Sequence, residues 1–257
     1  MFIDSHCHLS FPELQQQLPK ILDEMKAAQV DQAICVCTTM EEFPTVQGIA
    51  AAHPNLWATV GVHPDSEDGV HEPSVEELVQ AARDPKVVAI GETGLDYYRL
   101  NGRTIEEMEW QRERFRTHIR ASKQTGKPLV IHTRSSADDT LRVLREESGS
   151  HGVFHCFTES AEVALAAIEL GFYVSFSGIL TFKNAQALRD VAQQLPMDRL
   201  LIETDSPYLA PIPYRGKTNS PAYVPHVAKA LAELKGVPVE ELAERTTANC
   251  KKLFNLP

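Results

Sequence analysis

Short apolar runs alternate with amphipathic segments along the whole chain, and this alternation limits the possible folds more than any other feature. The apolar runs are rich in Val, Ile and Phe, which is typical of strands buried on both faces of a parallel sheet. The expected strands are residues 2–6, 32–38, 56–63, 87–92, 129–132, 153–157, 173–177 and 200–205. Eight strand–helix units in 257 residues predict an α/β fold, the closed (β/α)8 or TIM barrel, with a doubly wound open sheet as the alternative.

The segments between the expected strands have the period of amphipathic helices. Helices are expected at residues 14–28, 43–52, 75–82, 104–125, 137–147, 162–170, 185–194, 224–235 and 239–254. Gly126 and Pro128 separate the long helix from the next strand, as a glycine followed by a proline often does. No Gly/Ser-rich linker or low-complexity tract interrupts the pattern, so we expect one domain over residues 1–257.

The chain carries 25 Lys and Arg against 35 Asp and Glu, a net charge of −10. This balance argues against a protein that coats nucleic acid, because neutralising phosphates needs clustered positive charge. Bound metal cations are one local source of such charge. The five cysteines form no Cys-x-x-Cys pair, which predicts reduced thiols in a chain of this length. The absence of an apolar signal region and of a run of about 20 apolar residues predicts a soluble cytoplasmic protein with no membrane partner.

Ionisable side chains gather at or just beyond the carboxyl ends of the expected strands. They are His6, His8, His63, Glu92, His132, His155 and Asp205. One histidine in such a place is more often a hydrogen-bonded structural residue, but seven independent placements are not explained in that way. In a barrel these strand ends form one rim, so residues far apart in the sequence converge there.

His6 and His8 stand two positions apart on an extended segment and therefore face the same side, where both rings can bind one cation. Glu203 and Asp205 repeat this spacing, and we expect the deeper Glu203 to accept a hydrogen bond from a ligand histidine. Four histidines and two carboxylates exceed the ligands of one tetrahedral zinc, which favours two divalent cations. Glu92 is the expected bridge, since a carboxylate has two oxygens to share.

Six motifs, taken in order, resemble those of the TatD family of metal-dependent hydrolases. They are Asp4-Ser5-His6-Cys7-His8, Gly61-Val62-His63-Pro64, Gly91-Glu92-Thr93-Gly94-Leu95-Asp96, Val130-Ile131-His132-Thr133-Arg134, His155-Cys156-Phe157-Thr158 and Glu203-Thr204-Asp205-Ser206-Pro207-Tyr208. The resemblance extends from Asp4 to Asn249. It implies a distorted TIM barrel of the metallo-dependent hydrolase type and a deoxyribonuclease activity that depends on divalent metal.

The resemblance also implies the metal ligands. One cation would be held by His6, His8, Glu92 and Asp205, and the other by Glu92, His132 and His155. His63 resembles a residue of the substrate pocket more than a fixed ligand. The cations can be zinc, manganese or magnesium as far as the sequence is concerned.

The expected mechanism is attack on phosphorus by a water that the two metals activate, with Asp205 as proton acceptor and Glu92 as the other catalytic residue. Expected substrate-binding residues are His63, Arg134, Arg215 and Lys217, with Tyr97, Tyr98 and Tyr208 stacking on unpaired bases. The expected substrate is DNA, bound locally at a single-stranded or frayed end and cut from that end by a monomer without an obligate protein partner. Two alternatives stay open: an amide or ester hydrolase or deacylase acting on small molecules, and a metal-binding protein without activity.

Overall fold

The computed structural model describes residues 1–66, 70–149 and 151–257. Its strands are β1 (Phe2–Cys7), β2 (Val30–Cys35), β3 (Leu56–Val60), β4 (Val87–Asp96), β5 (Leu129–Arg134), β6 (Gly152–Phe154), β7 (Tyr173–Phe176) and β8 (Leu200–Ile202). Each strand pairs in parallel with the next, in the order β1 to β8. This sequential order confirms the predicted TIM barrel, because a doubly wound sheet would reverse its strand order at a switch point.

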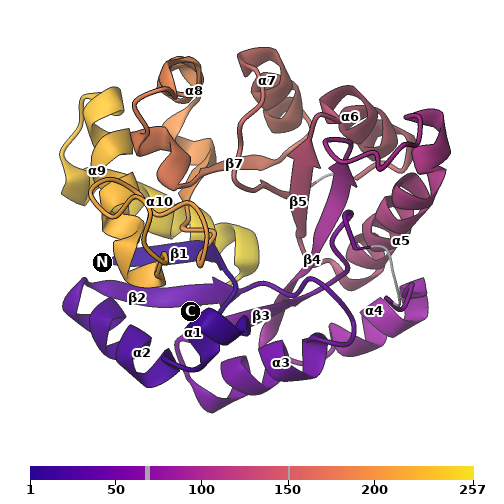
Figure 1. Ribbon diagram of the computed structural model, residues 1–257, viewed down its shortest axis with the longest axis horizontal. Helices are drawn as coiled ribbons and strands as arrows, with labels where there is room; N and C mark the ends of the chain where they lie inside the picture. Colours follow the sequence, from indigo (N-terminus) through magenta and orange to yellow (C-terminus); the bar gives the residue numbers. More distant parts are fainter. Residues whose placement is uncertain (67–69, 150) are drawn as a thin grey trace.

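Helices surround the strands in chain order (Figure 1). They are α1 (Pro12–Gln15), α2 (Leu18–Ala27), α3 (Phe43–Ala52), α4 (Val75–Ala81), α5 (Glu109–Thr125), α6 (Ala137–Glu146), α7 (Ala161–Glu169), α8 (Gln186–Gln194), α9 (Val224–Lys235) and α10 (Val239–Phe254). Short 3-10 helices occupy Glu106–Met108, Gly178–Thr181, Met197–Arg199 and Pro221–Tyr223. Among the described residues, no helix has the length and apolar character needed to cross a membrane.

Two of the predicted helices differ from the structure by more than one residue. The single helix expected at residues 14–28 is divided into α1 and α2, because Pro19 cannot continue a helix from Gln15 but fits well in the first turn of a new one. The long helix expected from Thr104 begins as a 3-10 turn at Glu106 and becomes α-helical at Glu109. Both differences concern helix starts, which patterns of apolar residues define poorly.

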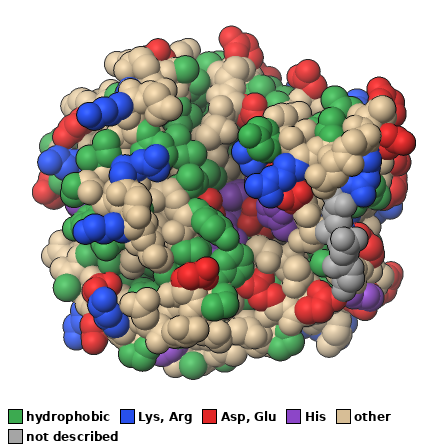
Figure 2. Space-filling view, in the orientation of Figure 1, with side chains coloured by type: hydrophobic (Ala, Val, Ile, Leu, Met, Phe, Trp, Pro, Cys, Tyr) green, Lys and Arg blue, Asp and Glu red, His purple; other side chains and the backbone are tan. Residues whose placement is uncertain are grey.

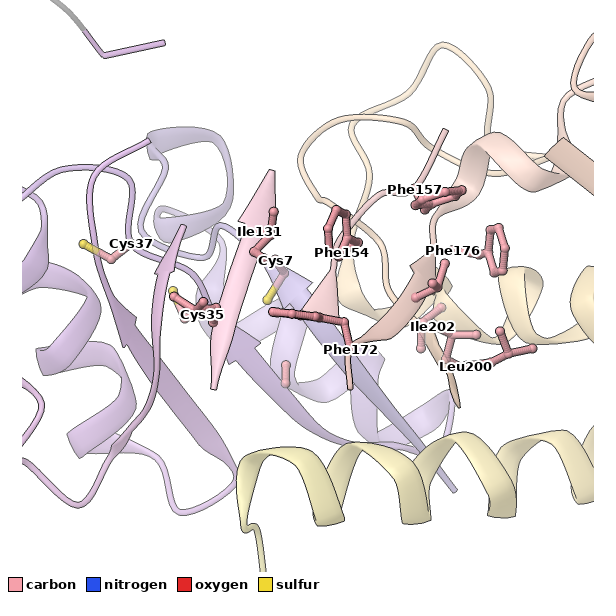
Figure 3. Close-up of a cluster of buried hydrophobic side chains, with 14 of the residues drawn as sticks. Cys7, Cys35, Cys37, Ile131, Phe154, Phe157, Phe172, Phe176, Leu200 and Ile202 are labelled. Atoms are coloured by element: carbon pink, nitrogen blue, oxygen red, sulfur yellow. The ribbon is translucent and has the colours of Figure 1, made fainter. Parts of the chain in front are cut away.

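Apolar side chains form two buried layers. The outer layer lies between strands and helices and includes Phe154 and Phe172, whose rings meet edge to face at 5.5 Å (Figure 3). The inner layer lies inside the barrel and includes Val130, Val153 and Leu201. Residues of α10 join this inner layer, and its Asn249 donates to the carbonyl of Leu200 at the start of β8. Helix α10 therefore closes the end of the barrel where the strands begin.

The first strand and the segment after the last strand meet near the opposite end of the barrel. The N–H of Asp205 donates to the carbonyl of His6 at 2.9 Å. The buried carboxylate of Asp4 accepts from the backbone N–H of Thr204 at 2.9 Å and from its hydroxyl at 2.6 Å. These bonds bring together two parts of the candidate site that are almost 200 residues apart in sequence.

Candidate metal centre

The alternation of side chains along the strands carries polar groups into the barrel above the inner apolar layer. Val130 on β5 belongs to that layer, and His132 follows it by two residues. Val153 on β6 stands in the same relation to His155. Because a spacing of two keeps side chains on one face of a strand, both histidines point into the barrel.

Glu92 reaches the same space from β4, although not from the end of the strand as the sequence predicted. Strand β4 continues to Asp96, so Glu92 lies inside it. The pairing of β4 with β5 shifts register between Ile90 and Thr93, where Glu92 sits. Such irregularities redirect a side chain, which accounts for a buried carboxylate at this level of the barrel.

The two oxygens of Glu92 face two different groups of histidines. Its Oε2 lies 3.3 Å from Nε2 of His6 and 3.8 Å from Nε2 of His8. Its Oε1 faces ring nitrogens of His155, His132 and His63 at 2.8, 3.2 and 3.3 Å. One carboxylate therefore stands between two sets of ring nitrogens that could hold a metal ion.

Asp205 completes the group around His6 and His8. Its Oδ1 lies 3.3 Å from Nε2 of His8 and 3.6 Å from Nε2 of His6. The strand β8 ends at Ile202, and Asp205 adopts a left-handed backbone conformation with φ of 56°. Its side chain is 15% exposed, against 3% for Glu92, so Asp205 is the carboxylate closer to solvent.

The hydrogen-bond partner on the far side of each ring indicates whether that histidine can bind a metal ion. His8 donates through Nδ1 to the carbonyl of Val36 at 3.3 Å, His155 through Nδ1 to Glu203 at 3.3 Å, and His132 through Nε2 to Asp96 at 3.0 Å. In each ring the donating nitrogen is the one directed away from Glu92, which leaves the other nitrogen available to a cation. A carboxylate or carbonyl behind the ring is the usual support of a metal-binding histidine. The Nε2 atom of His155 is moreover buried and makes no hydrogen bond, although Oε1 of Glu92 lies 2.8 Å away. These residues fit divalent metal ions.

Electrostatics favour cations at this centre. Burial raises the pKa of Glu92, but the adjacent His155, His63 and His6 more than reverse this and hold its pKa well below the ordinary value. Burial likewise opposes the ionisation of Asp205, yet hydrogen bonding to His8 and the nearby histidine charges lower its pKa. Both carboxylates are therefore ionised at neutral pH. They supply the negative charge that divalent cations require.

Asp96 is a member of the site that sequence analysis did not assign. Its carboxylate accepts from His132, and its main chain is held at both the N–H and the carbonyl by Gln111 of α5. The signal was present in the sequence, because Asp96 follows Glu92 by four residues on one strand and so shares its face. The expected role of Glu203 beside His155 agrees with the observed contact.

The expected substrate-binding residues lie in different surroundings. His63 is within the histidine–carboxylate group, with Nε2 3.4 Å from Nδ1 of His132. The three cations instead rest on aromatic rings: Arg134 on Tyr98 at 3.6 Å, Arg215 on Phe182 at 3.7 Å, and Lys217 near Tyr214 at 5.9 Å. Among the described residues, none of these three cations forms an ion pair with Glu92 or Asp205.

The space-filling view shows histidines at the floor of a hollow on this face, with Lys and Arg side chains beside it (Figure 2). Tyr98 and Tyr208 are exposed on loops after β4 and β8, at 60% and 56%. Tyr97 is buried and donates its hydroxyl proton to Asp139, so it is not free to stack on a base as the sequence suggested.

An eight-stranded parallel barrel with histidines and carboxylates gathered at one end defines the class of metal-dependent TIM-barrel hydrolases. Residues 3–255 match the family model described as TatD related DNase. The chain belongs to this family, as its motifs suggested.

Similar proteins are likewise described as metal-dependent hydrolases. The chain is 45% identical over 259 residues to the uncharacterized metal-dependent hydrolase YcfH of Escherichia coli, covering 99% of this chain and 96% of YcfH. It is 37% identical to the uncharacterized metal-dependent hydrolase YabD of Bacillus subtilis, with full coverage of both chains. The crystal structure of YjjV, a TatD homolog from E. coli, superposes with a TM-score of 0.92 at 31% identity, covering 100% of this chain and 98% of that one. The chain is a metal-dependent hydrolase.

Proposed function

We propose that this protein hydrolyses phosphodiester bonds of DNA at unpaired strand ends, using two divalent cations. One cation would be held by His6, His8, Glu92 and Asp205, and the other by Glu92, His132 and His155. The description of the matching family, TatD related DNase, supports the choice of substrate. An acidic chain can act on DNA in this way because the cations supply positive charge at the point of contact.

The observation that carries the proposal is that the two carboxylate oxygens of Glu92 face different groups of histidines. A buried, ionised carboxylate whose two oxygens face separate sets of ring nitrogens is suited to bridge a pair of cations. A single-cation site needs only one such set. Metal pairs about 3.5–4 Å apart are typical of enzymes that cleave phosphate esters.

When bound, the cations would polarise the phosphate and lower the pKa of a water molecule. Asp205 would accept a proton from a water molecule beside it, since it is ionised and its side chain reaches toward solvent. Glu92 is too deeply buried for this task and instead keeps the two ligand sets at a fixed separation. His155 is oriented by Glu203 and His132 by Asp96, so their rings do not have to reorganise during the reaction.

Substrate contacts would come from exposed side chains around the hollow. Arg134, Arg215 and Lys217 are the phosphate contacts, and the exposed ring of Tyr98 beside Arg134 is available to an unpaired base. Three phosphate contacts on a single strand predict a shallow slope of about −2 for log affinity against log salt. A much steeper slope would point to a long basic groove and contradict this mode of binding.

The decisive variant is Asp205→Asn, with Asp198→Asn, an exposed residue beside the start of β8, as the matched control. Both are purified, reconstituted separately with Zn, Mn or Mg, and incubated with end-labelled single- and double-stranded DNA and RNA. We expect wild type and the control to shorten single-stranded DNA from its end and Asp205→Asn to lose at least about 100-fold in rate, as for loss of a general base. Near-normal turnover by folded Asp205→Asn refutes the assigned role. Cleavage of amides but not of DNA by wild type would select the amide hydrolase instead.

A further inference from the structure

His63 differs from the other histidines of the site in what lies behind its ring. The backbone N–H of Asp65 donates to Nδ1 of His63 at 3.0 Å. A backbone N–H can only donate, so this nitrogen must present its lone pair. In the neutral ring the proton is then on the other nitrogen, Nε2.

The proton on Nε2 of His63 points into the centre of the site. This atom lies 3.3 Å from Oε1 of Glu92 and 3.4 Å from Nδ1 of His132, both of which can accept a hydrogen bond. The proposed function assigns the lone pair of His132 Nδ1 to a cation, so Oε1 of Glu92 is the acceptor that remains when the site is loaded. A ring nitrogen that carries a proton has no lone pair for a metal ion. His8, His132 and His155 show the opposite arrangement, because each donates to an acceptor behind the ring and presents the unprotonated nitrogen to the site.

The loop that carries Asp65 is held in place by α5. Arg114 donates through one guanidinium nitrogen to the carbonyls of His63 at 2.7 Å and Pro64 at 3.3 Å. The guanidinium of Arg114 is buried and also binds the carboxylate of Glu72. The N–H of Ser66 closes the turn by donating to the carbonyl of His63 at 3.2 Å. The Asp65 N–H is thus fixed behind the ring by bonds that do not involve the ring itself.

We infer that His63 is a positioning residue whose Nε2–H donates to Oε1 of Glu92, and that it binds no metal ion. Proximity alone would group His63 with Glu92 and His132 as ligands. The proton that Asp65 forces onto Nε2 decides against that grouping. The donated bond holds Oε1 turned toward His132 and His155, the ligand set that the proposed function assigns to the second cation. The inference deepens that function and rests on it for the identity of the reaction.

The first test counts and locates the cations without using any substrate. Cations per chain are measured for wild type, His63→Ala, His63→Gln and, as the contrasting ligand variant, His132→Ala. We expect both His63 variants to keep the wild-type number and His132→Ala to lose one cation. In the 113Cd-loaded, 15N-histidine protein, His63 should show a proton on Nε2 and no coupling to cadmium. Loss of a cation from His63→Ala, or cadmium coupling at His63, overturns the inference.

The second test asks whether the donor itself matters. Glutamine places an amide N–H near the position of the histidine Nε2, whereas alanine removes the donor. With a small chromogenic phosphodiester, we expect kcat of His63→Ala to fall about 10–100-fold with little change in KM, and His63→Gln to recover at least several-fold. Equal activity of wild type and His63→Ala, or no recovery with glutamine, overturns the positioning role. If wild type hydrolyses no phosphodiester, the proposed function fails, while the cation count and the NMR spectrum still decide the inference.

Discussion

The stability of the protein in acid should depend strongly on one residue outside the metal centre, His118. Helix α5 buries this ring completely against the loop that carries His63. Its Nε2 accepts from the N–H of Val62 at 3.0 Å, and its Nδ1 donates to the carbonyl of Arg114 at 2.8 Å. The bond from Val62 requires the neutral ring, because a proton on Nε2 would face the N–H of Val62. Burial lowers the pKa of His118 from 6.5 to about 4.

The sign and size of the effect follow from proton linkage. Between pH 6.5 and about 4 the unfolded chain binds a proton at His118 and the folded chain does not, so the free energy of unfolding falls as the pH falls. Each pH unit in this range lowers the free energy of unfolding by about 1.4 kcal/mol. Protonation of His118 in the unfolded chain therefore lowers it by about 3 kcal/mol in total by pH 4. The full stability is present above pH 6.5, and below pH 4 this group makes no further difference.

The assay is urea unfolding at half-unit steps from pH 4 to 7.5, for wild type and His118→Gln. Glutamine offers an oxygen to the Val62 N–H and has no titrating ring. Carboxylates titrate in the same range in both proteins, so the difference between the two curves isolates His118. We expect His118→Gln to lose about 3 kcal/mol less than wild type between pH 6.5 and 4. His53→Gln, at the half-buried end of α3, serves as the control for replacing a histidine by glutamine elsewhere in the fold. Parallel curves for His118→Gln and wild type would refute the reasoning.

Three further outcomes are expected. Gly94→Ala should lower the free energy of unfolding by at least about 3 kcal/mol and reduce cation content, both measurable on the purified variant, because an added Cβ would lie 2.0 Å from the carbonyl of His132. Lys86→Met should cost about 1–2 kcal/mol in urea unfolding without changing cation content, since the Lys86 ammonium donates to the carbonyls of His53, Pro54 and Leu56 around the start of β3. Zn or Mn should raise the Tm of wild type, and chelation should reverse this, with a clearly smaller increase in Asp205→Asn; an equal increase in both would show that the ions bind elsewhere.

The barrel was predictable because each strand is a short apolar run buried on both faces, and such runs stand out in the sequence. The approximate places of His132 and His155 followed from the same runs, since parallel strands bring their carboxyl ends to one rim. Glu92 was expected at the end of its strand, but β4 extends to Asp96 and the carboxylate enters the site through a register shift. Irregular pairing depends on contacts with neighbouring strands, which no local pattern records.

The hydrogen bonds within the site could not be predicted from residue types alone. Nothing in the sequence indicates that the N–H of Asp65 reaches Nδ1 of His63, because that bond depends on Arg114 in a helix about fifty residues further along. The burial of Tyr97 was hidden for a similar reason, since its partners Asp139 and Arg112 belong to two different helices. Tyr98, the next residue, is exposed. The sequence alone does not distinguish these adjacent tyrosines, because the difference in burial arises from the packing of α5 and α6.

The meeting of the first and last parts of the barrel has a consequence for biosynthesis. Asp4 binds Thr204, and the N–H of Asp205 binds the carbonyl of His6, so the group of His6, His8 and Asp205 forms only when both ends of the barrel are present. During translation His6 and His8 leave the ribosome long before Asp205 is made. A nascent or truncated chain that stops before residue 205 therefore lacks a complete site. With the proposed ligands, the order of synthesis leaves the metal centre incomplete until nearly the whole barrel has been made.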